Sequence, residues 1–154
     1  MKKLVLFFAL IGCSFSPVFV GHDTDVYVAP ISGINGIELR NSLNAQFGGA
    51  HEDKARYNLT VNLQEPITQY KALERTGGAT WQEVKLTASY VLKDGNKEIA
   101  RGKESAAESY TFVQYLVASN ASYNNAVLNT IRVLAEKISM HVITETQKNQ
   151  DKIE

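Results

Sequence analysis

Residues 57–64 read Tyr-Asn-Leu-Thr-Val-Asn-Leu-Gln, a stretch in which large apolar side chains alternate with polar ones. This period of two is typical of a strand that buries one face against a core and turns the other toward water. Residues 84–92 repeat the alternation, and the Asp-Gly and Gly-Asn steps in residues 93–97 are typical of a tight turn. We therefore predict a hairpin in which a strand at about 81–92 returns as an antiparallel strand at about 98–110.

Helical spacing is found on both sides of these strands. In residues 33–47, large apolar side chains recur every four positions, at Leu39, Leu43 and Phe47. Asn35 is placed to cap this helix, and Glu38 follows three residues later, in the position of a capping box. From about residue 122 onward apolar side chains lie three or four apart, which predicts a long second amphipathic helix.

These segments predict the order β-α-β-β-β-α. The first strand is expected at residues 24–31, where Pro30 ends it. We predict one α+β domain over residues 24–146, a two-layer sandwich in which a four-stranded mixed sheet carries both helices on one face. The other face of the sheet is polar and available to water or to a polar partner. The polar residues 147–154 are expected to form a fraying tail.

Composition excludes several classes of function. The chain has 154 residues with 16 Lys+Arg and 16 Asp+Glu, and this zero net charge removes the basic field on which non-specific nucleic-acid binding depends. Its three histidines, His22, His51 and His141, show no metal-ligand spacing, and no nucleophile or phosphate-loop motif occurs. We therefore predict no enzyme activity, no metal, no cofactor and no nucleic-acid partner.

The N-terminus has the features of an export signal. A basic start at residues 1–3 precedes an apolar run at residues 4–11, which is far too short to span a bilayer. The run ends in Leu-Ile-Gly-Cys, the lipobox of bacterial lipoprotein signals. We predict a signal peptide at residues 1–12 that is cleaved before Cys13, whose thiol receives the lipid.

The residues after Cys13 predict where the protein is anchored. Residues 13–23 contain Pro17 and Gly21 without a period, and we expect a lipidated tether. Ser14 stands where an aspartate usually marks retention in the inner membrane. The expected location is therefore the periplasmic face of the outer membrane.

The connection from Glu65 to Gly78 is long for a hairpin and mixes apolar and cationic side chains: Ile67, Tyr70, Leu73, Lys71 and Arg75. Exposed apolar groups beside cations would suit a surface that enters a membrane protein or grips an anionic amphiphile. A loop that folds back and buries its own apolar residues fits the pattern equally well. The aromatic-rich segment 110–123 is expected to pack between the sheet and the second helix.

Taken together, the chain resembles the lipopolysaccharide-assembly lipoprotein family LptE from Cys13 to about His141. Three segments carry the resemblance: Cys-Ser-Phe-Ser-Pro-Val-Phe at 13–19, Arg-Thr-Gly-Gly-Ala-Thr at 75–80 leading into Val84-x-Leu-Thr-Ala-Ser-Tyr90, and Glu108-Ser109-Tyr110 before a final helix containing Leu-Ala-Glu-Lys-Ile at 134–138.

The resemblance implies a non-catalytic protein that plugs the lumen of the outer-membrane β-barrel LptD, assists its folding and contacts lipopolysaccharide. Arg75 occupies the place of a basic residue that contacts lipopolysaccharide in the family, and Lys71 is a second candidate. A further basic residue that some members carry before the last helix has no counterpart here, where Ser119 and Asn120 stand. An auxiliary lipoprotein of an ABC-type lipid transport system is the main alternative, and a small periplasmic hydrolase is a third.

Overall fold

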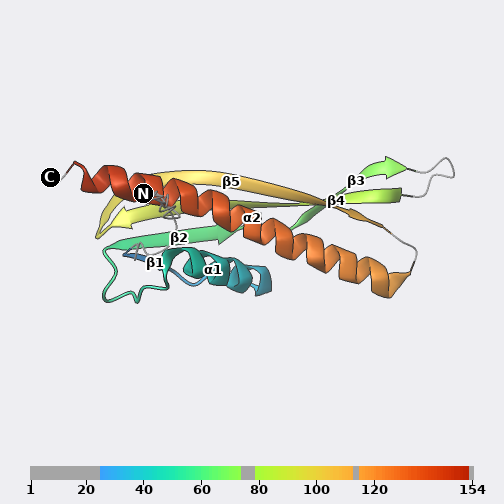
Figure 1. Cartoon of the computed structure of the whole chain (residues 1–154), viewed down its shortest axis with the longest axis horizontal. Helices are drawn as coiled ribbons and strands as arrows, with labels where there is room; N and C mark the ends of the chain where they lie inside the picture. Colours follow the sequence, from blue (N-terminus) through green and yellow to red (C-terminus); the bar gives the residue numbers. More distant parts are fainter. Residues whose placement is uncertain (1–24, 74–78, 113–114, 153–154) are drawn as a thin grey trace, which may run out of the picture.

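The computed structural model describes residues 25–73, 79–112 and 115–152 of the chain. It is an elongated α+β sandwich in which a five-stranded mixed sheet carries two helices on one face (Figure 1). This confirms the predicted fold class. The elements in chain order are β1 (Val26–Val28), α1 (Ile34–Phe47), β2 (Tyr57–Leu63), β3 (Ile67–Leu73), β4 (Ala79–Asp94), β5 (Lys97–Thr111) and α2 (Leu116–Gln150).

Strand β4 organises the sheet. Its C-terminal half pairs antiparallel with β2, its N-terminal half pairs antiparallel with β3, and β5 follows its other edge for almost the whole length. Strands β2 and β3 therefore lie end to end along one edge of β4. Strand β1 pairs parallel with β2, and α1, which lies between these two strands in the chain, provides the crossover.

Strand β3 is the fifth strand, which the sequence did not predict. We expected residues 65–78 to be a connection, whereas residues 67–73 form a strand that pairs with β4. Between β2 and β3, only residues 64–66 lie outside the pairing with β4. Even there, the Gln64 amide donates to the Thr87 carbonyl at 2.9 Å. Residues 67–71 of β3, the part whose burial is described, are all exposed, so the sequence lacks the alternation by which the other strands were recognised.

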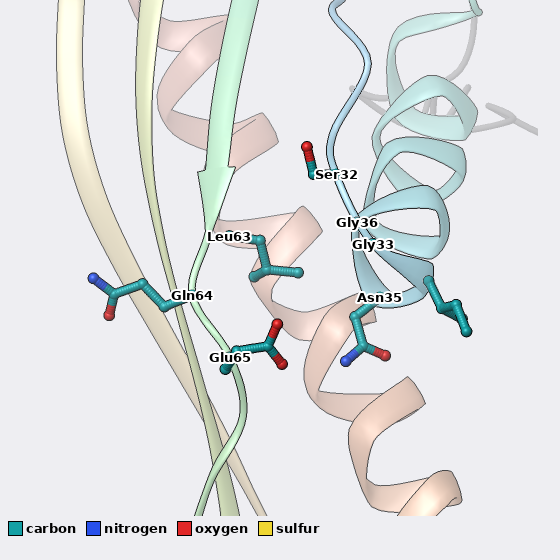
Figure 2. Close-up of a pocket in the computed structure, with 8 residues that line it drawn as sticks. Ser32, Gly33, Asn35, Gly36, Leu63, Gln64 and Glu65 are labelled. Atoms are coloured by element: carbon teal, nitrogen blue, oxygen red, sulfur yellow. The ribbon is translucent and has the colours of Figure 1, made fainter.

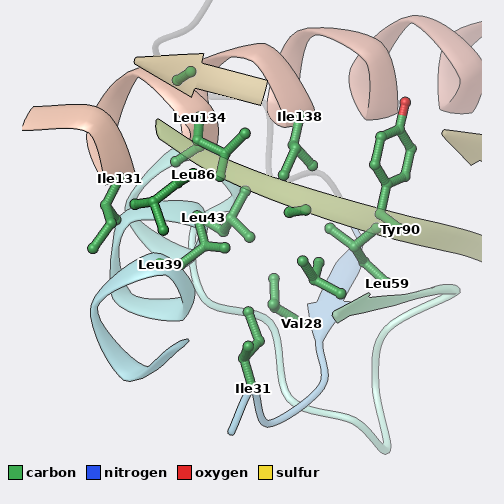
Figure 3. Packing of buried hydrophobic residues seen from close by; sticks show 14 of the residues in the cluster. Val28, Ile31, Leu39, Leu43, Leu59, Leu86, Tyr90, Ile131, Leu134 and Ile138 are labelled. Atoms are coloured by element: carbon green, nitrogen blue, oxygen red, sulfur yellow. The ribbon is translucent and has the colours of Figure 1, made fainter. Parts of the chain in front are cut away.

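The core lies between the sheet and the two helices (Figure 3). Apolar side chains from every element except β3 are buried in one cluster, and the largest fully buried ones include Leu39, Leu43, Phe47, Tyr57, Leu59, Leu86, Leu92, Ile131, Leu134 and Ile138. The apolar side chains that recur every four residues in α1 and every two residues in β2 and β4 point into this cluster. The predicted core faces of these elements are therefore correct.

The helix ends differ from the predicted ones. Gly33, with φ 82°, is the N-cap of α1 and no side chain caps it, so the predicted capping role of Asn35 is wrong: Asn35 already lies inside the helix. Helix α2 begins at residue 116 instead of about 122. It also continues to residue 150, so the predicted fraying is wrong for residues 147–150.

A polar contact holds this end of α2 against the sheet. Asn149 Nδ2 donates to Asp94 Oδ2 at 2.8 Å, and Arg56 Nη2 donates to the same oxygen at 2.9 Å. Residue 94 ends β4, so the contact joins the last turn of α2 to the turn between β4 and β5.

Asp94 is expected to make the protein more stable near neutral pH than in acid. The hydrogen bond from Arg56, supported by the one from Asn149, holds the pKa of Asp94 below its ordinary value. Because the pKa is lower in the folded than in the unfolded state, this stabilisation is complete above the unfolded pKa of about 3.9 and is lost as pH falls through the folded pKa. We expect Asp94→Asn to lower the free energy of unfolding near pH 7 and to change it little near pH 2. Chemical denaturation at both pH values tests this, and an equal loss at both would contradict it.

Candidate functional site

The end of the sheet remote from the β4–β5 turn exposes many large apolar side chains. We call it the distal end and define it as residues 67–71 of β3, 81–85 of β4, 108–112 at the end of β5 and 115–117 at the start of α2. Its exposed apolar residues are Ile67, Tyr70, Trp81, Phe112, Tyr115, Leu116 and Val117. In Figure 1 the β3–β4 hairpin projects past the part of the sheet that the helices cover. Exposed large apolar side chains gathered toward one end of a molecule are typical of interaction surfaces.

Part of the distal end is fixed by a buried aromatic and amide cluster. Tyr70, Gln82 and Tyr110 pair across β3, β4 and β5, so the three side chains share one face of the sheet. The Tyr110 hydroxyl donates to Gln82 Oε1, and the rings of Tyr110 and Tyr123 meet edge to face at 5.9 Å. Burial raises the pKa of Tyr110, which keeps its hydroxyl protonated as a donor. Tyr70 remains 70% exposed at the side of this cluster.

The aromatic residues of segment 110–123 therefore divide into a packed pair and an exposed pair. Tyr110 is buried and Tyr123 is half-buried, as the predicted packing between sheet and helix requires. Phe112 and Tyr115 are instead exposed. The prediction was correct for Tyr110 and Tyr123 and wrong for Phe112 and Tyr115.

Of the predicted lipopolysaccharide-binding residues, only Lys71 lies in the described part of the chain. Its Nζ is 2.9 Å from Glu83 Oε1, and 46% of the side chain is exposed. This ion pair between β3 and β4 neutralises the positive charge of Lys71. An anionic ligand would need that charge in order to bind there. The pairing was invisible in the sequence because it depends on the register of a strand that was not predicted. Arg75 and the predicted lipidation site Cys13 lie outside the described residues.

A cavity of about 260 Å³ lies between the start of α1 and the end of β2 (Figure 2). Its lining is Ser32, Gly33, Ile34, Asn35, Gly36, Leu63, Gln64 and Glu65. Figure 2 shows the Glu65 carboxylate and the Asn35 amide on opposite sides of the space. Glu65 is the one charged residue in this lining, and a carboxylate repels phosphate, so the cavity does not suit an anionic ligand.

The described histidines are not arranged for metal binding. His141 Nε2 lies 3.2 Å from Glu104 Oε1, a contact between α2 and β5, and His51 is exposed on the loop after α1. Within residues 25–73, 79–112 and 115–152, no three His, Cys, Asp or Glu side chains are close enough to share a metal ion. His22 lies outside these ranges.

No helix in the described part of the chain combines the length and the apolar character needed to cross a membrane. Even α2, with 35 residues, has charged and polar side chains along much of its surface.

Comparison with known proteins places the fold among lipoproteins. No protein-family model and no curated protein matches the sequence. A candidate lipoprotein from Caulobacter crescentus has a TM-score of 0.64 at 19% identity, over 79% of this chain and 90% of that chain. Rare lipoprotein B from Shewanella oneidensis has a TM-score of 0.61 at 14% identity, over 82% and 98%. A minor lipoprotein from Acinetobacter baumannii has a TM-score of 0.55 at 15% identity, over 81% and 93%. The chain shares the fold of these proteins.

Proposed function

We propose that this chain, which has the fold of rare lipoprotein B and of other bacterial lipoproteins, is an outer-membrane lipoprotein of the LptE type. It would plug the lumen of an LptD-like β-barrel, assist the assembly of that barrel and bind lipopolysaccharide during transport to the cell surface. The proposed role is non-catalytic and needs no cofactor other than the covalent lipid on Cys13. The exposed apolar distal end is the observation that carries the proposal.

The two surfaces of the molecule fit this role in different ways. The sheet face away from the helices is polar and exposed, with Thr60, Asn62, Lys85 and Ser89 among its residues. Such a face suits the lumen of a barrel, which is polar. The distal end instead offers side chains such as Trp81 and Leu116, which are poorly hydrated unless a partner covers them.

Recovery of a single barrel with the purified protein tests the proposal. The tagged chain would be purified from detergent-solubilised outer membranes, and the proteins that accompany it identified by mass spectrometry. We expect one large β-barrel in near-equal amount. Recovery of inner-membrane transport subunits would instead favour the auxiliary lipoprotein of an ABC-type system, and recovery of no partner would contradict the proposal.

A matched pair of variants shows whether the distal end makes the contact. Leu116, at the start of α2, is 75% exposed at the distal end, and Ile34, at the start of α1, is 87% exposed elsewhere. We expect Leu116→Asp to reduce the amount of copurified barrel and Ile34→Asp to leave it unchanged. Equal effects of the two substitutions would remove the distal end from the contact.

Arg75 is the leading candidate for the lipopolysaccharide contact, because a guanidinium binds phosphate bidentately and Lys71 is already paired with Glu83. Hydrogen bonds to charged groups contribute about 1.5–3 kcal/mol, so Arg75→Glu is expected to weaken lipopolysaccharide binding about tenfold or more. Lys71→Gln is expected to have a smaller effect. Pull-down of the two variants with immobilised lipopolysaccharide tests this, and unchanged binding by Arg75→Glu would remove the assignment.

A further inference from the structure

The outer edge of β5 has main-chain groups that do not pair with any other strand among the described residues. β5 forms a ladder with β4 alone, so its other edge is the boundary of the sheet. An open strand edge presents a row of amide donors and carbonyl acceptors, which makes it a template for another strand.

Two hydrogen bonds show which residues point their main chain toward this edge. Ser105 pairs with Thr87, and the Thr87 carbonyl accepts from the Gln64 amide on the side away from β5. The Thr87–Ser105 pair is therefore one that exchanges no main-chain hydrogen bonds, and the Ser105 groups point outward. Lys137 Nζ of α2 confirms this by donating to the Ser105 carbonyl at 2.8 Å.

The alternation of an antiparallel ladder extends this result along the strand. Ala107, Ser109 and Thr111 have the same parity as Ser105, and the register of this part of the ladder is regular. Their amides and carbonyls consequently point outward as well. Lys137 occupies the Ser105 carbonyl. The outward main-chain groups of the next three such residues, Ala107, Ser109 and Thr111, have no partner among the described residues.

Charge distribution divides the edge into a protected and an open half. Proteins protect exposed strand edges with charged residues, Lys above all, and with Pro. Residues 97–104 read Lys-Glu-Ile-Ala-Arg-Gly-Lys-Glu and are protected in this way. Residues 105–111 read Ser-Ala-Ala-Glu-Ser-Tyr-Thr, with no Lys, Arg or Pro and with Glu108 as the one charge.

A groove of about 260 Å³ runs between the open half and α2. One wall is residues 108–111 of β5, and the other contains Ser122, Asn125 and Asn129 of α2. Among the described residues, neither these three side chains nor Glu108 has a hydrogen-bond or ion-pair partner. A strand edge facing a helix across a groove is the arrangement by which extended peptides are bound as an added strand.

We propose that this groove binds an extended polypeptide segment of a partner protein, which adds to the outer edge of β5 as a further strand. The amides and carbonyls of Ala107, Ser109 and Thr111 would supply the main-chain hydrogen bonds. Side chains of the segment that face α2 would be polar, with a Lys or Arg beside Glu108. This binding site goes beyond the proposed function, which assigns no role to the edge of β5.

Hydrogen exchange of the full mature chain tests the proposal directly. In the free protein, the amides of Ala107, Ser109 and Thr111 are expected to exchange fast and those of Ala106, Glu108 and Tyr110 slowly. The probe is the blocked peptide Thr-Lys-Val-Thr-Val-Lys-Thr, whose alternate residues place Lys, Thr and Lys on one face. We expect it to bind with a dissociation constant of about 1 mM or lower and to slow exchange at the three open amides.

A pair of substitutions at one position isolates the main-chain contribution. Ser109→Pro removes an outward amide that makes no hydrogen bond within the sheet, and edge strands tolerate proline in this orientation. It is expected to weaken peptide binding about tenfold or more, whereas Ser109→Ala, which keeps the amide, changes binding less than about twofold. Unchanged binding by Ser109→Pro would overturn the proposal.

Other results identify a different occupant and would also overturn it. Slow exchange at the three open amides in the free monomer would show that the chain covers its own edge. Dimerisation that Ser109→Pro abolishes would assign the edge to a second copy. Saturation of the groove by a methyl glycoside without binding of the peptide would make it a sugar site. Absence of saturable peptide binding in the unsubstituted chain refutes the proposal even where Ser109→Pro fails to fold.

Discussion

Replacement of Leu134 by alanine is expected to lower the free energy of unfolding by about 2–5 kcal/mol. Leu134 of α2 is fully buried and projects into the space between the helices and the sheet, near Ile138 and Leu86 (Figure 3). Alanine is the best helix former, so the loss would come from packing and not from helix propensity. Since small domains are stable by about 5–15 kcal/mol, one such cavity removes a large share of the total.

The neighbouring residue provides the control. Val133 is on the same turn of α2 but 41% exposed, so Val133→Ala is expected to change the free energy of unfolding much less than Leu134→Ala. Chemical denaturation of the purified mature chain gives both values. Similar losses for the two variants would mean that α2 does not face the sheet through Leu134.

The second large effect is expected from Cys13→Ser. The substitution removes the thiol that would receive the diacylglyceryl group, and each buried methylene of a lipid chain contributes about 0.8 kcal/mol to membrane binding. More than one long chain gives stable anchoring, so we expect the part of the variant that is not bound to a barrel to move from the membrane to the soluble fraction. Cell fractionation measures this, and mass spectrometry of the unsubstituted protein checks for the lipid.

Two substitutions at Ser14 separate anchoring from sorting. Ser14→Ala is expected to leave the protein in the outer membrane, and Ser14→Asp to retain it in the inner membrane with its lipid intact. Cys13→Ser that remains, free of any barrel, in the membrane fraction after an alkaline carbonate wash would contradict lipid anchoring at this residue.

The sequence predicted those elements that bury one face. Strands β2 and β4 alternate, and α1 has a four-residue period, because each meets the core on one side only. Strand β3 was missed for the same physical reason, since its residues 67–71 are all exposed. The start of α2 was placed too late because residues 116–118 are exposed and carry no pattern relative to a core.

The candidate site was predicted only in part. The mixture of apolar and cationic residues in 65–78 drew attention to a segment that contains exposed apolar side chains of the distal end, Ile67 and Tyr70. The Lys71–Glu83 pair and the edge of β5 depend on the register between strands distant in sequence, which single-segment patterns do not specify. Arg75 remains a prediction from the family resemblance.

The continuity of β4 has a consequence for the thermodynamics of binding at the distal end. Strand β4 has 16 residues and at about 3.3 Å per residue extends about 53 Å, and α2 has 35 residues and at about 1.5 Å per residue extends a similar length. The same strand that lies in the core therefore also orders the distal hairpin. Fixing the backbone of a flexible loop costs about 1–2 kcal/mol per residue in conformational entropy. Residues such as Tyr70 and Trp81 are already ordered in the folded protein, so a partner that binds them does not have to order them. A partner that covers these side chains would bind a preorganised surface and retain more of its favourable contact energy as affinity.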